Sequence, residues 1–149
     1  MDVRFFYKGD YRSYKHEVII TSFSIAVSRI IDLPEILEVC LYPLEENVYG
    51  GIDKMRVNRI GLNTNLSLES IPIILAHELI HVHQKHVGHL RIAHNGMCYW
   101  HGIPITNKPP EDMTYEEYQN LPWEVDVRNR SKAILKEALL SYNSCLTSY

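Results

Sequence analysis

Apolar and polar residues recur along the chain in patterns that predict both helices and strands. In residues 16–34, HEVIITSFSIAVSRIIDLP, apolar side chains have helical spacing, and Pro34 is expected to stop the helix. Three shorter segments, residues 38–44, 46–55 and 57–66, have the apolar content and the bends that are typical of short strands. We expect these three strands to form a small antiparallel sheet. The predicted helical stripe consists of Val18, Ile19, Phe23, Ala26, Val27, Ile30 and Ile31.

A second helix is predicted over roughly residues 71–87. Ser70 is expected to cap its start, Pro72 fits its first turn and Gly88 can end it. The segment is apolar on several sides, which is typical of a buried helix. Its apolar residues include Ile74, Leu75, Leu79 and Val82.

The remainder of the chain predicts a strand or hairpin at residues 97–106, a loop, and a last helix over roughly residues 123–142. Together these elements favour an α+β fold in a single domain that spans residues 1–149. Steps of four and three residues place one set of side chains on a common face of the last helix. These are Glu124, Arg128, Ser131, Leu135, Ala138 and Tyr142.

Composition favours a soluble globular protein and excludes several function classes. Hydrophobic residues make up 46% of the 149 residues and charged residues 22%, with a formal net charge of −3. Lysine and arginine are dispersed, so we expect no nucleic-acid partner. No apolar run approaches the roughly 20 residues of a membrane span, so we expect no membrane association.

The cysteines and the N-terminal residues indicate a reducing compartment. Cys40, Cys98 and Cys145 lie far apart without CxxC spacing, so neither a disulfide framework nor a cysteine-based zinc site is expected. Residues 1–12, MDVRFFYKGDYR, contain no apolar segment typical of a signal peptide. We therefore expect a cytoplasmic protein.

Residues 74–84, ILAHELIHVHQ, carry the main candidate for chemistry. His77 and His81 stand one helical turn apart on one face, so both imidazoles can reach one zinc ion at about 2.0–2.1 Å. Glu78 lies about 100° around the helix, where its carboxylate can take a proton from a zinc-bound water. This spacing is the HExxH signature. The alternative is a chance match, but a buried His-His-Glu cluster without an ion would be costly.

A catalytic zinc needs a third protein ligand, and the residues leave two candidates open. Val87 stands where a metzincin has its third histidine, which excludes that subclass. His94 follows His81 by thirteen residues and could return from a loop. Glu124 could arrive from the last helix.

Three ordered segments, AHELIHVHQ (76–84), YWHG (99–102) and LPWEVDVRN (121–129), resemble small phage-encoded zincin-type metallopeptidases. The pattern of that group is HExxHxxQ, a W-x-G strand, and then a Tyr and PWE-x-E/D, and the resemblance covers roughly residues 47–135. It implies a minimal zincin-like fold with an HExxH helix, a C-terminal ligand helix, a Zn²⁺ cofactor and Glu124 as the gluzincin-like third ligand. A phage origin would place the protein in the host cytoplasm.

The chain departs from the gluzincin pattern at one position. Arg128 stands where many gluzincins carry an acidic residue that accepts a hydrogen bond from a ligand histidine, and arginine has no acceptor. Asp126 or a backbone carbonyl would have to orient the ring. A rival resemblance, to SprT-like proteases, rests on RIAHNGMCYW (91–100) and makes His94 the third ligand. It leaves the PWE segment unexplained, so we prefer Glu124.

We therefore expect a zinc metallopeptidase that acts on a peptide or protein substrate with Glu78 as general base. A catalytically inactive zinc-binding interaction protein on the same fold is the alternative. Tyr115, Tyr118 and His101 are open candidates for stabilising the tetrahedral oxyanion. By analogy with zincins, the strand at residues 57–66 is expected at the sheet edge beside the cleft, where an extended substrate could pair with it.

Overall fold

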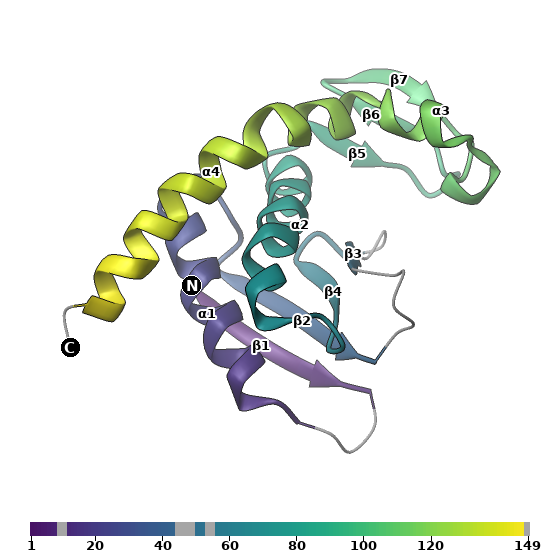
Figure 1. Cartoon of the computed structure of the whole chain (residues 1–149). Helices are drawn as coiled ribbons and strands as arrows, with labels where there is room; N and C mark the ends of the chain where they lie inside the picture. The colour runs from purple at the N-terminus through teal and green to yellow at the C-terminus, as the bar shows by residue number, and fades with distance from the viewer. Residues whose placement is uncertain (9–11, 44–49, 53–55, 148–149) are drawn as a thin grey trace.

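The first half of the chain contains a four-stranded sheet, and helices cover one face of this sheet (Figure 1). The computed structural model describes residues 1–8, 12–43, 50–52 and 56–147. Along β2, Leu37, Val39 and Leu41 are buried under the helices, while the residues between them are partly exposed. The strands are β1 (Asp2–Tyr7), β2 (Ile36–Tyr42), β3 (Gly50–Ile52) and β4 (Arg59–Asn63), in the order β1-β2-β4-β3.

The overall α+β class is confirmed, but strand direction in this sheet differs from the expectation. β1, which the sequence pattern did not predict, pairs in parallel with β2, and β2 pairs in parallel with β4. Antiparallel pairing holds for β3 with β4. A helix between β1 and β2 carries the chain back across the sheet, which permits parallel pairing, whereas a hairpin cannot.

The expectation that residues 57–66 form the sheet edge is wrong, because β4 lies between β2 and β3. The main chain of β4 already pairs with β2 in parallel on one side and with β3 in antiparallel on the other. The outer position next to β4 belongs to β3. The rest of the predicted strand at 46–55, residues 46–49 and 53–55, lies outside the described residues.

Helix α1 (Tyr14–Ser28) begins where Ser13 accepts a hydrogen bond from the His16 backbone N–H. Its buried side chains share one core with those of β2 and β4. Phe23 is fully buried, as the apolar stripe predicts. Val18, which was placed on the same stripe, is 62% exposed, while Ile20 takes the core position instead. The helix ends at Ser28, before the predicted stop at Pro34.

Helix α2 (Ile71–His86) confirms the predicted central helix. It follows a short 3₁₀ turn, η1 (Leu68–Ser70), so Ser70 makes no side-chain capping bond and its hydroxyl pairs with that of Ser67 instead. Gly88 adopts a φ of 84° just after the helix, which ends it at little steric cost. Leu75, Leu79 and Ile80 are fully buried, so α2 lies in the centre of the molecule.

A second, three-stranded antiparallel sheet follows α2. It contains β5 (Leu90–Ile92), β6 (Cys98–Trp100) and β7 (Ile103–Thr106). The predicted hairpin at 97–106 is thus confirmed: β6 and β7 are joined at His101 and Gly102, which both have positive φ, as a type I′ hairpin turn requires. Short turns η2 (Pro110–Asp112) and α3 (Tyr115–Gln119) lead back toward the helices.

The last helix, α4 (Pro122–Thr147), starts at the residue before Trp123 and crosses α1 and α2 (Figure 1). Its buried positions include Glu124, Val127, Ile134 and Ala138. Of the residues predicted to share one face of this helix, Glu124 and Ala138 are buried and Arg128 is exposed. In the described part of the chain, no helix combines the length and the apolar character needed to cross a membrane.

Candidate metal centre

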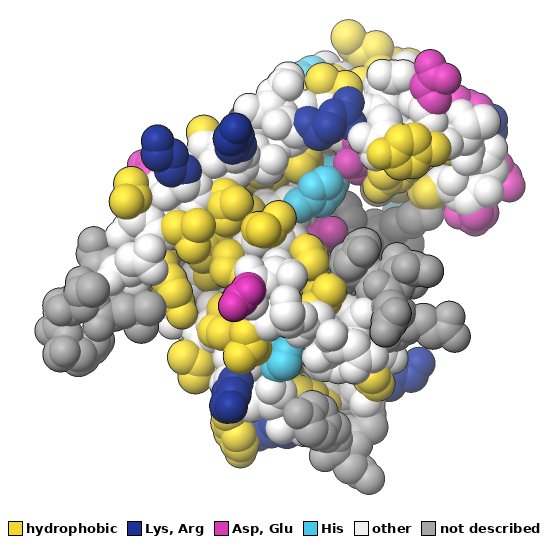
Figure 2. Space-filling model, in the orientation of Figure 1, with side chains coloured by type: hydrophobic (Ala, Val, Ile, Leu, Met, Phe, Trp, Pro, Cys, Tyr) yellow, Lys and Arg dark blue, Asp and Glu magenta, His cyan; other side chains and the backbone are white. Residues whose placement is uncertain are grey.

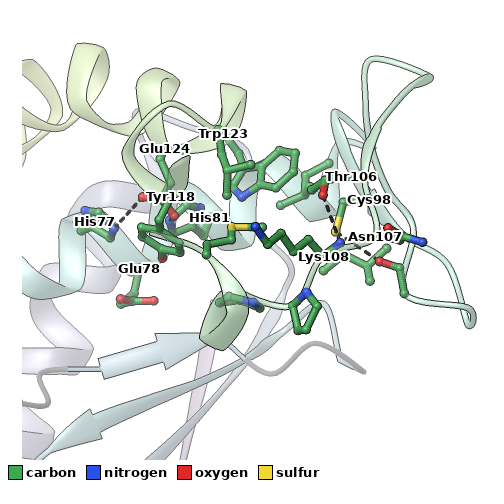
Figure 3. Close-up of a pocket in the computed structure, with 17 residues that line it drawn as sticks. His77, Glu78, His81, Cys98, Thr106, Asn107, Lys108, Tyr118, Trp123 and Glu124 are labelled. Carbon is green, nitrogen blue, oxygen red and sulfur yellow. Dashed lines mark hydrogen bonds and ion pairs between the residues drawn. The ribbon is translucent and has the colours of Figure 1, made fainter. Parts of the chain in front are cut away.

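Three side chains from two helices converge at the crossing of α2 and α4 (Figure 3). His77 Nε2 lies 3.6 Å from Glu124 Oε2, and His81 Nε2 lies 3.1 Å from Glu124 Oε1. One potential ligand atom from each residue lies within 4.8 Å of the other two. Two imidazoles and one carboxylate form a donor set of the kind that catalytic zinc uses.

Helix geometry accounts for this convergence. The four-residue spacing places His77 and His81 on one face of α2, with ring centroids 5.0 Å apart. Glu124 lies in the first turn of α4, which packs directly on α2. His81 and Glu124 are buried at 4% exposure each, whereas the side chain of His77 is 40% exposed and opens the group to solvent.

The pKa shifts of Glu124 and His77 favour the forms that bind a cation, whereas the shift of His81 favours its protonated form. Burial alone would raise the pKa of Glu124, but the hydrogen bond from His81 and the nearby imidazoles outweigh it and lower that pKa. The carboxylate is therefore ionised near neutral pH. Burial lowers the pKa of His77, with a further contribution from His81, which favours its neutral, ligating form. Burial also opposes charge on His81, yet Glu124 raises its pKa overall.

Glu78 lies beside the three converging residues and lines the same pocket. It is 8% exposed, and burial raises the pKa of its carboxyl group from 4.5 to about 7; His81 acts in the opposite direction and Glu124 raises it further. Two buried carboxylates near each other repel, and a bound cation would relieve that repulsion. A carboxyl group with a pKa near neutrality is also suited to general-base catalysis.

A chain of hydrogen bonds fixes the orientation of the His81 ring. Its Nδ1 lies 2.8 Å from Gln84 Oε1 and donates to it, so the neutral form of the ring carries its lone pair on Nε2, the nitrogen nearest Glu124. The Gln84 amide donates to the Trp123 carbonyl at 3.0 Å and to Asp126 Oδ2 at 2.8 Å. Arg130 donates in turn to Asp126 Oδ2 at 2.7 Å.

The sequence pointed to Asp126 as a residue that orients a ligand ring, but not to Gln84, which connects Asp126 to the His81 ring. Gln84 could have been predicted as a partner of His81, because it follows His81 by three residues and so lies on the same side of the helix. Gln84 is completely buried with its amide fully engaged, which an ordinary helix glutamine is not. Arg128 is turned outward and donates to Gln119.

Of the three candidates for the oxyanion donor, Tyr118 alone lines the pocket at the site. Its hydroxyl forms a hydrogen bond with Glu124. Burial, followed by the negative charge of Glu124, raises the pKa of Tyr118 well above its usual range, so the hydroxyl keeps its proton. Tyr115 is 81% exposed, and His101 lies exposed in the β6–β7 turn.

His94 lies exposed in the turn between β5 and β6 and is not among the residues that converge. The other histidines that follow the motif have separate contacts. His83 Nδ1 lies 2.7 Å from the Asp32 carbonyl oxygen, and His86 Nε2 lies 3.5 Å from Asp32 Oδ1. His89 stacks on His101, with ring centroids 4.3 Å apart.

A pocket of about 340 Å³ opens onto the converging side chains. Its walls come from α2, the β5–β7 sheet, the segment that contains η2 and α3, and the start of α4 (Figure 3). Figure 2 shows histidine and acidic side chains at the surface where the β5–β7 part of the molecule meets the helices. The candidate ligands are thus reachable from solvent on one side and supported by buried groups on the other.

No protein-family model, curated protein or solved structure matches the chain. The residues and their geometry alone therefore carry the functional interpretation. They bring His77, His81 and Glu124 together as a group that could hold a metal ion.

Proposed function

We propose that the chain is a zinc-dependent metallopeptidase on a minimal zincin-like fold. His77, His81 and Glu124 hold the ion, and Glu78 serves as general base in the hydrolysis of a peptide bond. The observation that carries the proposal is the convergence of two imidazoles and a carboxylate from two helices, beside a pocket that contains a second buried carboxylate.

The donor set and its surroundings fit zinc. Two nitrogen ligands and one oxygen ligand leave one position for water or substrate, as catalytic zinc sites do. The Gln84 contact presents Nε2 of His81 to the ion, a support that ligating histidines commonly have. A bound zinc ion would supply a Lewis acid that polarises the substrate carbonyl and lowers the pKa of water to about 7.

The chain's own groups would then carry out proton transfer and charge stabilisation. Glu78 accepts the proton of the attacking water and passes it to the leaving amine. Tyr118 keeps its proton, and when a substrate is bound its hydroxyl can turn from Glu124 and donate to the oxygen that becomes negative in the tetrahedral intermediate.

Zinc stoichiometry tests this proposal first. We expect elemental analysis to find about one zinc per chain in the wild type and in His94→Ala, and a loss of zinc in Glu124→Ala, because Glu124, and not His94, lies with the two histidines. The reverse pattern would make His94 the ligand, as in the SprT-like alternative. A wild type without zinc after reconstitution would refute the metal centre.

Peptide cleavage separates the enzyme from the inactive zinc-binding alternative. The zinc-loaded wild type should cleave members of a broad peptide library, and a chelator should stop the reaction. Stoichiometric zinc without cleavage of any member would favour the interaction protein.

Gln84→Met should weaken zinc binding by about 10- to 100-fold, the usual effect of removing a partner of a ligand histidine. Methionine has a similar volume but cannot accept the hydrogen bond from His81 Nδ1. Competition with a chromophoric chelator measures the dissociation constant. Lys85→Met, one position along α2 and outside this hydrogen-bond chain, is the matched control and should retain wild-type affinity. Equal affinities for both variants would show that Gln84 does not support the centre.

A further inference from the structure

We propose that the pocket beside the metal centre binds a large apolar side chain of the substrate, adjacent to the bond that is cleaved. This inference rests on the proposed function and names its substrate class: peptides with a bulky aliphatic or aromatic residue next to the scissile bond.

The size and lining of the pocket carry this inference. Its volume of about 340 Å³ is well above the roughly 150 Å³ of a cavity that accepts benzene. A phenylalanine or leucine side chain and part of the adjoining backbone therefore fit. Away from the polar site groups, its walls are largely apolar, formed by Leu90, Ile92, Met113, Leu121 and Trp123.

These walls are held in place by their own packing. Leu90, Leu121 and Trp123 form a small buried core, with exposures of 3%, 8% and 8%. Ile92 and Met113 pack against it. On the outer side, the Lys108 ammonium lies 2.9 Å from Glu117 Oε2 and ties the loop after β7 to α3. The pocket is therefore largely formed before a ligand enters, as binding pockets usually are.

The pocket and the candidate metal ligands share one cavity. Trp123 in the apolar wall immediately precedes Glu124, and Glu78, His77 and His81 line the same space. A side chain seated against Trp123 thus belongs to a residue whose peptide bond lies close to the converging groups. Among the described lining residues outside the site, Lys108 is the charged one, and it is already paired. A charged substrate side chain would lose water without gaining a partner there.

Direct binding tests the preference without relying on turnover. The probe set is a series of blocked, glycine-rich pentapeptides with Phe, Leu, Ala or Lys at the centre, titrated by calorimetry into zinc-loaded Glu78→Gln protein. We expect the Phe and Leu peptides to bind about 10- to 100-fold more tightly than the Ala and Lys peptides, from the apolar area they bury. They should also slow alkylation of Cys98, which lines the pocket, relative to Cys40, which does not.

Two variants on β7 test whether the preference for Phe and Leu peptides arises in this pocket. Thr106→Trp fills the pocket and should reduce the Phe-to-Ala ratio of affinities to less than about threefold. Ile105→Trp, one residue earlier and on the other side of the strand, should keep the wild-type ratio. Equal affinity for Phe and Ala peptides, or an unchanged preference in Thr106→Trp, would overturn the inference. A pocket-dependent preference in a protein whose wild type cleaves nothing would refute the proposed function and leave the pocket's apolar preference standing.

Discussion

Glu78→Gln is expected to retain zinc and to lower kcat for peptide hydrolysis by about 10²- to 10⁴-fold, the usual contribution of a general base. Glutamine keeps the shape of the side chain but cannot accept the proton from the attacking water. Glu78 lies beside the candidate ligands without belonging to their group, so its replacement should leave the zinc stoichiometry unchanged.

Unfolding is not expected to explain this loss. Burial raises the pKa of Glu78 to about 7, which means that the folded protein disfavours its charged form. A neutral glutamine should therefore preserve stability or increase it. Glu69→Gln, an exposed acid in η1 just before α2, is the matched control and should keep full activity. Retained hydrolysis in Glu78→Gln would remove Glu78 from the mechanism, and loss of zinc would make it a ligand.

Phe23→Ala is expected to lower the free energy of unfolding by about 3–5 kcal/mol, as large-to-small changes of buried aromatic residues do. Phe23 is fully buried in the core between α1, the sheet and the other helices. For a chain of this length we expect the melting temperature to fall by roughly 10 °C. Thermal and urea unfolding measured by circular dichroism would provide both values.

Val18→Ala is the comparison that makes this result informative. Val18 lies on the same helix and was predicted on the same apolar stripe, yet it is 62% exposed. Its truncation should change stability by less than about 0.5 kcal/mol, as surface substitutions usually do. Similar losses for the two variants would contradict the orientation of α1 on the sheet.

Much of the candidate site could be predicted because its signals are local. The spacing of His77 and His81 fixes their relative position on any helix, and Pro72 and Gly88 bracket that helix in the sequence. The hairpin at β6–β7 was likewise predictable, because apolar residues stand on both sides of Gly102 within one short segment.

Other features depended on contacts between distant segments. The apolar pattern of β2 and β4 is compatible with either strand direction, and the parallel arrangement arises from how α1 and β1 fit beside them. On α4, helical spacing allowed a face containing Arg128, but packing on α2 selected the neighbouring face with Val127. The role of Gln84 depends on Trp123 and Asp126, about forty residues away.

The sequence by itself determined the HExxH helix, the identity of its polar residues and the general mixture of helices and strands, since each follows from periodicity within a short segment. Only the tertiary structure decided that Glu124 rather than His94 meets the two histidines, that Tyr118 reaches the site, and that an apolar pocket adjoins it. The physical reason is that backbone geometry fixes distances between neighbours in sequence. Distances between α2, β5–β7 and α4 follow instead from which buried surfaces pack together.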